Sequence, residues 1–149
     1  MKRLTGTASA VIAAPIEECF SLLAAVEAYP SWYAAVVRGV EVIDVAGDGR
    51  PSTVRTTLHV SYGPLARDFP LVLAIDLEQP GAVTLTRLPN DASDHEEFEV
   101  IWRLENMGRT RIALELDAKL DLPRLVPLGG IGDGMADGFV GAASRALGC

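Results

Sequence analysis

The feature that most constrains the fold is an alternating segment over residues 93–123, interrupted once at Asn106-Met107-Gly108. On both sides of this interruption, apolar residues alternate with charged or polar ones, which is the period of a strand with one buried face. Two such runs joined by a short glycine-containing turn predict a long β-hairpin. Its apolar face needs a cover from another part of the chain. The apolar positions are Phe98, Val100, Trp102, Leu104, Ile112, Leu114, Leu116, Ala118 and Leu120.

Five further segments have the character of strands, and all of them precede the hairpin. They are rich in β-branched or small residues, and turn sequences such as Gly-Asp-Gly and Gln79-Pro80-Gly81 separate several of them. Pro70 lies inside the fourth of these strands, which predicts an edge position or a bulge because proline cannot donate a hydrogen bond to a sheet. The five segments are residues 4–13, 40–49, 52–62, 66–78 and 82–88.

Two short helices are predicted directly after the first strand. Pro15 suits the first helical position, and Glu17 and Glu18 complement the positive end of the helix dipole. Pro30 ends this helix, because the residue before a proline avoids the helical conformation. The segment 30–37 predicts the second short helix.

The C-terminal segment predicts one long helix with an apolar stripe. Interior glycines weaken such a helix by up to about 1 kcal/mol each, so packing must hold it together. Glycine also permits close approach between backbones. This helix is the one substantial cover that the sequence offers for the apolar face of the sheet. Its stripe consists of Leu128, Ile131, Met135, Phe139, Ala142 and Ala146, and glycines occupy positions 129, 130, 132, 134, 138 and 141.

The segment 14–33 also carries a motif. Together with the order of the elements, it resembles the START-like superfamily (SRPBCC, or helix-grip), in its polyketide cyclase/dehydrase-like branch. The resemblance implies an α+β helix-grip fold. In this fold a curved antiparallel seven-stranded sheet wraps around a long C-terminal helix, and two short helices follow the first strand. The matching residues are Ala14-Pro15, Glu18, Phe20 and Tyr29-Pro30-Ser31-Trp32.

The resemblance further implies a deep apolar cavity between the sheet and the C-terminal helix, which binds a hydrophobic small molecule. The alternation and the helical stripe then indicate which side chains would line or approach the cavity. The alternative is that these side chains simply form the core, which is the commoner role of inward-facing aromatic residues. The residues are Tyr33, Phe98, Trp102, Leu114, Met135 and Phe139.

Three polar residues could add specificity to such a cavity. Thr56 and Tyr62 would contribute hydroxyl groups from the inward face of the third strand. Arg87 alternates with apolar neighbours and so points inward, where a ligand carboxylate or phosphate would satisfy its charge. The alternative is a structural ion pair with a carboxylate on a neighbouring strand, namely Glu97, Glu99 or Asp76.

The two histidines do not have the spacing of a metal site. His59 shares its strand face with Arg55 and Thr57, which predicts contact with solvent. His95 lies in a polar turn. We therefore expect no metal and no cofactor, and we assign no catalytic residue.

Length and charge limit the class of protein. A chain of 149 residues is the size of one domain, so we expect a single domain over residues 1–149. A formal net charge of −7 argues against binding to nucleic acid or to an anionic membrane surface. No apolar run approaches the ~18 residues that an integral membrane segment requires. Cys19 and Cys149 make no disulfide framework, which favours a reducing cytoplasm.

Three functions remain open from the sequence. The leading one is binding, or transport, of a hydrophobic small molecule such as a lipid, an isoprenoid or a polyketide. The second is a cyclase or dehydratase that uses Arg87 or Tyr62 to polarise a carbonyl or move a proton. Against it, residues 71–75 lack the cation that the cyclase branch carries on its fourth strand, and Val36 stands near the place of its tyrosine. The third is a protein–protein interaction module that uses the polar sheet face or the edge near Pro70.

Overall fold

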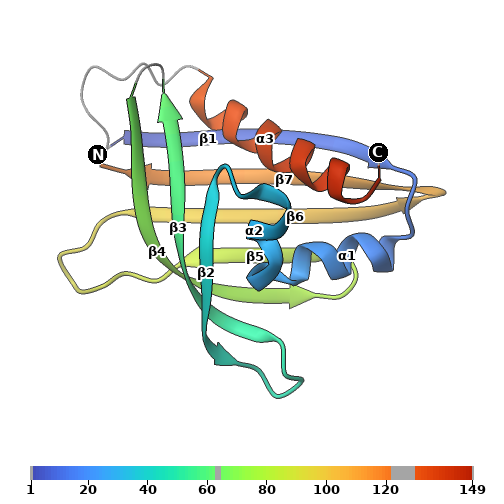
Figure 1. Cartoon of the computed structure of the whole chain (residues 1–149), viewed down its shortest axis with the longest axis horizontal. Coiled ribbons are helices and arrows are strands. Elements are labelled where there is room, and N and C mark those ends of the chain that lie inside the picture. Colours follow the sequence, from blue (N-terminus) through green and yellow to red (C-terminus); the bar gives the residue numbers. More distant parts are fainter. Residues whose placement is uncertain (1, 63–64, 122–129, 149) are drawn as a thin grey trace.

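Seven antiparallel strands form one curved sheet, and all the helices lie on the same face of it (Figure 1). The structure is a computed structural model that describes residues 2–62, 65–121 and 130–148. The strands follow the order β1-β7-β6-β5-β4-β3-β2 across the sheet. This arrangement confirms the predicted helix-grip fold. The strands are β1 (Lys2–Ile12), β2 (Val37–Val45), β3 (Pro51–Tyr62), β4 (Leu65–Glu78), β5 (Ala82–Arg87), β6 (Glu97–Met107) and β7 (Arg109–Leu120), and the helices are α1 (Ile16–Ala24), the 3-10 helix η1 (Val26–Ala28), α2 (Tyr29–Tyr33) and α3 (Ile131–Ala146).

The predicted hairpin is the pair β6–β7, which forms the centre of one half of the sheet. Trp102 lies opposite Leu114 in an unbroken antiparallel register, and Gly108 closes the turn with a φ of 88° that favours glycine. The apolar positions of both strands are buried in the core, while the alternate positions are exposed or half-buried. The alternation in the sequence therefore gave both the pairing and the buried face.

Pro70 does not lie on an edge strand, because β4 has β3 on one side and β5 on the other. The register between β3 and β4 also passes Pro70 without a bulge. However, β5 pairs only with Leu73–Glu78, so Pro70 belongs to the part of β4 that has a sheet neighbour on one side alone. Its missing N–H group is tolerated for the same physical reason that favours edge positions.

The two helices after β1 are shorter than the sequence suggests, and a 3-10 turn joins them. α1 buries one side, which includes Phe20 and Leu23, against the core. α2 ends at Tyr33 rather than at residue 37, because the chain turns over residues 34–36 and enters β2 at Val37. Tyr29 is buried at the junction and donates a hydrogen bond to the carbonyl of Leu23 at 2.6 Å.

The terminal helix α3 packs directly on β1 and also contacts β7. The closest point is between Gly132 and β1, where a Cβ atom on Gly132 would lie 2.1 Å from the carbonyl oxygen of Thr5. A Cβ atom on Gly6 would lie equally close to the carbonyl oxygen of Gly132. The predicted close backbone approach is thus confirmed at this turn, whereas the predicted stripe residue Leu128 lies outside the described residues. No helix in the described part of the chain is long and apolar enough to cross a membrane.

Candidate functional site

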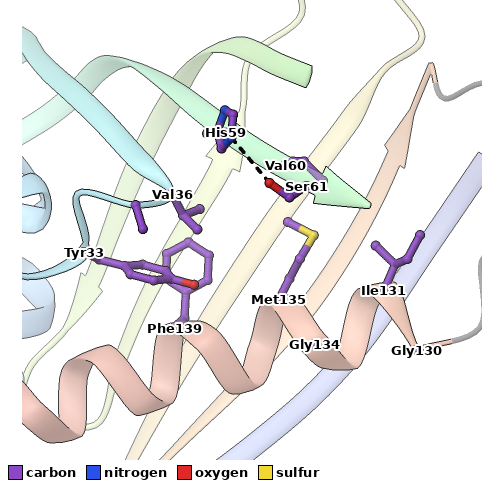
Figure 2. Close-up of a pocket in the computed structure, with 11 residues that line it drawn as sticks. Tyr33, Val36, His59, Val60, Ser61, Gly130, Ile131, Gly134, Met135 and Phe139 are labelled. Atoms are coloured by element: carbon purple, nitrogen blue, oxygen red, sulfur yellow. Dashed lines mark hydrogen bonds between the residues drawn. The ribbon is translucent and has the colours of Figure 1, made fainter. Parts of the chain in front are cut away.

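A groove of about 610 Å³ lies between α3, the end of β3 and the turn that follows α2 (Figure 2). Met135 and Phe139 project from α3 towards β3, and Tyr33 and Val36 close the side nearest to α2. Most of these side chains are apolar. The lining residues are Tyr33, Ala35, Val36, His59, Val60, Ser61, Gly130, Ile131, Gly134, Met135 and Phe139.

The groove exists because β3 continues beyond its partner β2. Pairing between these strands ends at Val37 and Leu58, and one further hydrogen bond joins the N–H of His59 to the carbonyl of Val36 at 2.7 Å. From there to Tyr62, β3 pairs with β4 alone. α3 meanwhile stays on β1 and β7, so it does not close the space beside the end of β3. Gly134 widens this space, because it has no side chain and nothing lies within 4 Å of where its Cβ would be.

A chain of aromatic rings closes the inner end of the groove. Trp32 stacks on Tyr33 with centroids 6.2 Å apart, and Tyr33 meets Phe139 edge-on at 4.8 Å. Gly138 makes this contact possible, since a Cβ there would lie 2.2 Å from the hydroxyl of Tyr33. Burial raises the pKa of Tyr33, and the nearby Arg145 partly opposes this shift. Tyr33 is therefore a neutral, packed wall of the groove at neutral pH.

Behind these rings, the interior holds an apolar void of only about 20 Å³. Such a volume holds about one water molecule. The void lies among buried side chains of β3, β4, β5 and β6, and Phe139 lines both the void and the groove. The deep cavity that the resemblance implies is thus divided in this structure. Phe139 separates an open outer part from an almost filled inner part.

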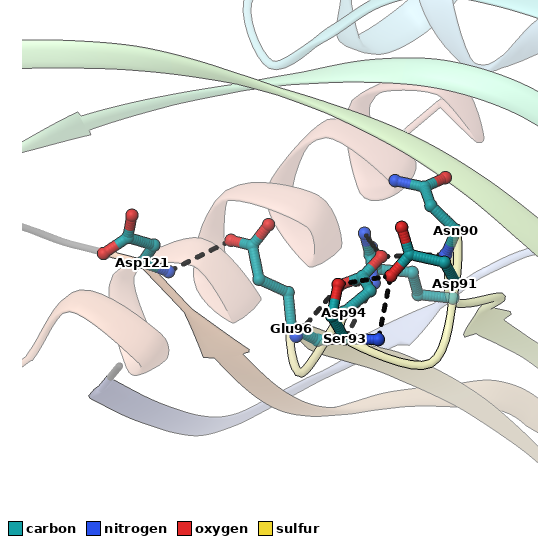
Figure 3. Close-up of polar contacts among 7 residues, drawn as sticks. Asn90, Asp91, Ser93, Asp94, Glu96 and Asp121 are labelled. Atoms are coloured by element: carbon teal, nitrogen blue, oxygen red, sulfur yellow. Dashed lines mark hydrogen bonds and ion pairs between the residues drawn. The ribbon is translucent and has the colours of Figure 1, made fainter.

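Arg87 is buried, as the alternation predicts, but its partner is not one of the expected carboxylates. Its guanidinium donates to both oxygens of Asp94, at 2.7 and 3.0 Å, and to the carbonyl oxygen of Glu96 at 2.8 Å. Asp94 also accepts from the backbone N–H groups of Asn90 and Glu96 (Figure 3). Hydrogen bonds from Arg87 hold the pKa of this carboxyl well below its usual range, and those from the backbone add to the effect.

The predicted partners Glu97, Glu99 and Asp76 are therefore wrong. Asp94 lies in the connection between β5 and β6, and it binds Arg87, the last residue of β5. Strand alternation gives the face on which a side chain lies but not the path of a connection. The Arg87 guanidinium holds that connection in place, and neither of its partners lines the groove.

The sequence reasoning missed a polar pair at the rim of the groove. His59 lies directly opposite Asp68 in the β3–β4 register, and its Nδ1 is 2.6 Å from the Asp68 Oδ1. The Nε2 atom of the same ring is 3.4 Å from the hydroxyl of Ser61. His59 shares the outer strand face with Arg55, as predicted, yet its side chain is only 24% exposed. Counting outward from residues 63 and 64, which separate β3 from β4 in the sequence, would have paired residue 59 with residue 68.

The comparisons with known proteins agree with this architecture. The family model for polyketide cyclase/dehydrase and lipid transport matches residues 12–142. The chain belongs to this family. Its fold is that of the START superfamily. No curated protein matches the chain.

Several solved structures share the fold of this polyketide cyclase/dehydrase family member. A START superfamily protein from Mycobacterium smegmatis has a TM-score of 0.77 at 18% identity, over 96% of each chain. The Zhui aromatase/cyclase from a Streptomyces species has a TM-score of 0.70 at 15% identity, over 98% of this chain and 94% of that one. A major latex-like protein from Panax ginseng has a TM-score of 0.66 at 12% identity, over 97% and 95%. At these identities the likeness shows the fold alone.

The structure divides the predicted ligand-binding residues of this family member into separate groups. Tyr33, Met135 and Phe139 line the groove. Thr56 and Phe98 line the small interior void, and the hydroxyl of Thr56 already donates to the carbonyl of Gly39 at 2.6 Å. The remaining four lie elsewhere. Trp102 and Leu114 are fully buried in the core and line neither space, Arg87 is paired with Asp94, and the side chain of Tyr62 lies outside the described part of the chain.

Proposed function

We propose that this protein binds a hydrophobic small molecule in the groove between α3 and β3. The observation that carries the proposal is the groove itself, whose volume of about 610 Å³ falls within the ~300–1,000 Å³ typical of small-molecule sites. Its wall is mainly apolar, with a few polar groups at the rim, which is the usual composition of such sites. The family description, which includes lipid transport, supports the same class of ligand.

The inner void sets the size of the ligand that fits without rearrangement. A void of about 20 Å³ cannot hold a ligand, so a small molecule occupies the outer groove alone. A larger one must displace the Phe139 ring, which lines both spaces. Met135 lies beside it, and its flexible thioether adapts easily to different apolar shapes. A lipid, an isoprenoid or a polyketide-like ring system meets these requirements.

A cyclase or dehydratase reaction on the bound molecule is the second candidate. The specific observation that favours it is the His59–Asp68 pair at the rim, because an oriented imidazole is a suitable proton acceptor. Arg87 gives this candidate no support, because Asp94 and Glu96 hold its two terminal guanidinium nitrogens and it does not line the groove, although its buried Nε has no hydrogen-bond partner. We therefore place binding first.

The test is native mass spectrometry of the freshly purified protein, followed by solvent extraction and identification of any retained molecule. A matched pair of variants shows whether the groove is the site. Gly134→Leu fills the groove from α3 and removes an interior glycine, so we expect it to fold normally and retain no ligand. Gly141→Leu makes the same change further along α3, outside the groove, where the tip of Arg145 is the nearest neighbour, and we expect it to retain the ligand.

Loss of the ligand from both variants, or from neither, would contradict the assignment of the groove. If wild-type protein retains nothing, and a panel of lipids, isoprenoids and aromatic polyketides leaves its melting temperature unchanged, the binding proposal fails. Conversion of an added panel compound into a product of altered mass, abolished by His59→Ala, would favour the enzyme instead.

A further inference from the structure

The polar side chains of the groove are gathered on the β3 side. Ile131, Met135 and Phe139 present apolar side chains from α3, whereas His59 and Ser61 line the opposite rim (Figure 2). The remaining polar side chain is Tyr33, whose hydroxyl is packed against Gly138. A groove with one apolar and one polar side fits an amphipathic molecule, whose polar end lies at β3.

The pairing of His59 with Asp68 determines what the imidazole can offer at that rim. An ionised carboxylate only accepts hydrogen bonds, so the Nδ1 atom that lies 2.6 Å from Asp68 carries the proton. In the neutral ring, Nε2 then has a free lone pair and acts as an acceptor. His59 and Asp68 are directly opposed across two paired strands, so the sheet register holds this arrangement.

The Nε2 atom has a weak partner at present. The Ser61 hydroxyl is 3.4 Å away, beyond the ~2.7–3.2 Å of an ordinary hydrogen bond of this kind. Ser61 is also exposed, so its hydroxyl can turn to solvent without loss. A hydroxyl group on a ligand can therefore replace that of Ser61 and make the shorter bond.

The charge at the rim selects against an anion. Asp68 places a carboxylate behind the imidazole, and the chain as a whole carries a formal charge of −7. A fatty-acid carboxylate would meet this charge, whereas a neutral hydroxyl would not. We propose that the ligand is a neutral alcohol or phenol with an apolar body, and that it donates a hydrogen bond from its hydroxyl to the Nε2 of His59. This inference rests on the proposed function, because it names the ligand class of the same groove.

The experiment uses matched pairs of compounds, one with a free hydroxyl group and one in which a methyl group replaces the hydroxyl proton. Dodecanol, naphthol and a phenolic steroid are each compared with their methyl ethers, and the dissociation constants are measured for the 149-residue chain. A methyl ether keeps the oxygen but cannot donate. One hydrogen bond predicts that wild-type protein prefers the hydroxyl compound by about two- to tenfold. His59→Ala should reduce this ratio to about one, whereas His95→Ala, at the other histidine, should leave it unchanged.

Asp68→Ala separates recognition from a merely structural role. The pair lies largely at the surface, where Asp68 is 59% exposed, so its removal should cost little stability. Without the carboxylate, the ring is free to carry its proton on Nε2, which then donates to alcohols and ethers alike. We expect this variant to lose the preference although it keeps the imidazole. Long-range proton–nitrogen correlation NMR should show the proton on Nδ1 in wild-type protein and its shift towards Nε2 in the variant.

The possible outcomes distinguish this inference from the proposed function. Equal binding of hydroxyl and ether compounds by wild-type protein would overturn the inference and leave the groove as a binding site. A preference that persists in His59→Ala would do the same. If no member of any pair binds, both the proposed function and the inference fail. Tighter binding of dodecanoate than of dodecanol would overturn the argument from charge.

Discussion

The sharpest test of the fold is Gly132→Ala, because the added methyl group has nowhere to go. The new Cβ atom would lie 2.1 Å from the carbonyl oxygen of Thr5 and 2.6 Å from its carbonyl carbon. Carbon–oxygen contacts of about 3.3–3.6 Å are normal, so the site is roughly 1 Å too tight. Both neighbours are backbone atoms of β1, which cannot rotate away as a side chain would. The first turn of α3 must therefore move off the sheet.

The magnitude follows from two opposing effects. Overpacking of this kind costs about 1–3 kcal/mol of the free energy of unfolding, and a clash with backbone atoms that cannot rotate away belongs at the upper end of this range. Alanine recovers up to about 1 kcal/mol relative to glycine inside a helix. The net loss is about 2 kcal/mol of the free energy of unfolding. For a domain of this size, that loss lowers the melting temperature by about 4–8 °C.

Gly134→Ala is the control, two residues further along the same helix. Nothing lies within 4 Å of its Cβ position, so alanine there should stabilise the protein by about 0.5–1 kcal/mol. Thermal and urea unfolding of the three proteins, followed by circular dichroism, measures both effects. If Gly132→Ala melts at or above the wild-type temperature, the close packing of α3 on β1 is refuted. If Gly134→Ala is destabilised as much as Gly132→Ala, the assumed helical geometry is refuted instead.

Three further predictions concern the aromatic wall and the buried ion pair. Gly138→Ala should displace the Tyr33 ring and weaken ligand binding. Adding Tyr33→Phe to this variant should restore binding, because without the hydroxyl the nearest ring atom is 3.4 Å from the new methyl group. Titration of the single and double variants with a bound ligand measures this double-mutant cycle. Phe139→Ala should join the groove to the interior void and lower the free energy of unfolding by about 3–5 kcal/mol. Binding should then shift towards larger members of a ligand series. Unchanged size selectivity would show that this ring does not separate the two spaces. The Asp94 pKa is lowered in the folded state, so the ion pair with Arg87 stabilises the protein above the ordinary Asp pKa of about 3.9 and this stabilisation is lost as the pH falls below that value. Asp94→Asn should be less stable than wild type at neutral pH and should lose less stability on acidification, as measured by urea unfolding at several pH values; parallel pH curves would contradict it.

The sequence predicted the elements whose signal repeats along the chain. The alternation around Asn106-Met107-Gly108 identified β6, β7 and their buried faces, because the side-chain period of a strand is independent of what packs against it. Pro15 marked the start of α1, but the prediction that Pro30 ends this helix was wrong, because α1 ends at Ala24 and Pro30 lies in the first turn of α2. Pro70 shows the limit of this reasoning. Its position depends on how far β5 extends, which is a property of a different segment.

The site was harder to predict, because it depends on distances between elements. The partner of Arg87 comes from a connection, whose path no periodicity describes. The division of the cavity at Phe139 depends on which side chains of other elements meet this ring, and a stripe at helical spacing does not identify them. The His59–Asp68 pair is different, since hairpin register follows from the position of a turn. That contact could have been predicted from the sequence.

The early end of β2 explains why the polar rim and the apolar groove occur together. The β2–β3 register shifts between Val37 and Val40, and the hydroxyl of Thr56 donates to the carbonyl of Gly39 at that point. Beyond it, β2 turns away towards α2, and the end of β3 keeps an open edge. The side chains of β3 near this edge alternate between the core and the outside, so Val60 lines the apolar wall while His59 and Ser61 lie at its border. Because the chain turns over residues 34–36, β2 ends at Val37, its pairing with β3 stops at Leu58, and the groove stays uncovered. The proposed binding site therefore depends on the short length of β2 at this end, and the core behind Phe139 can remain tightly packed.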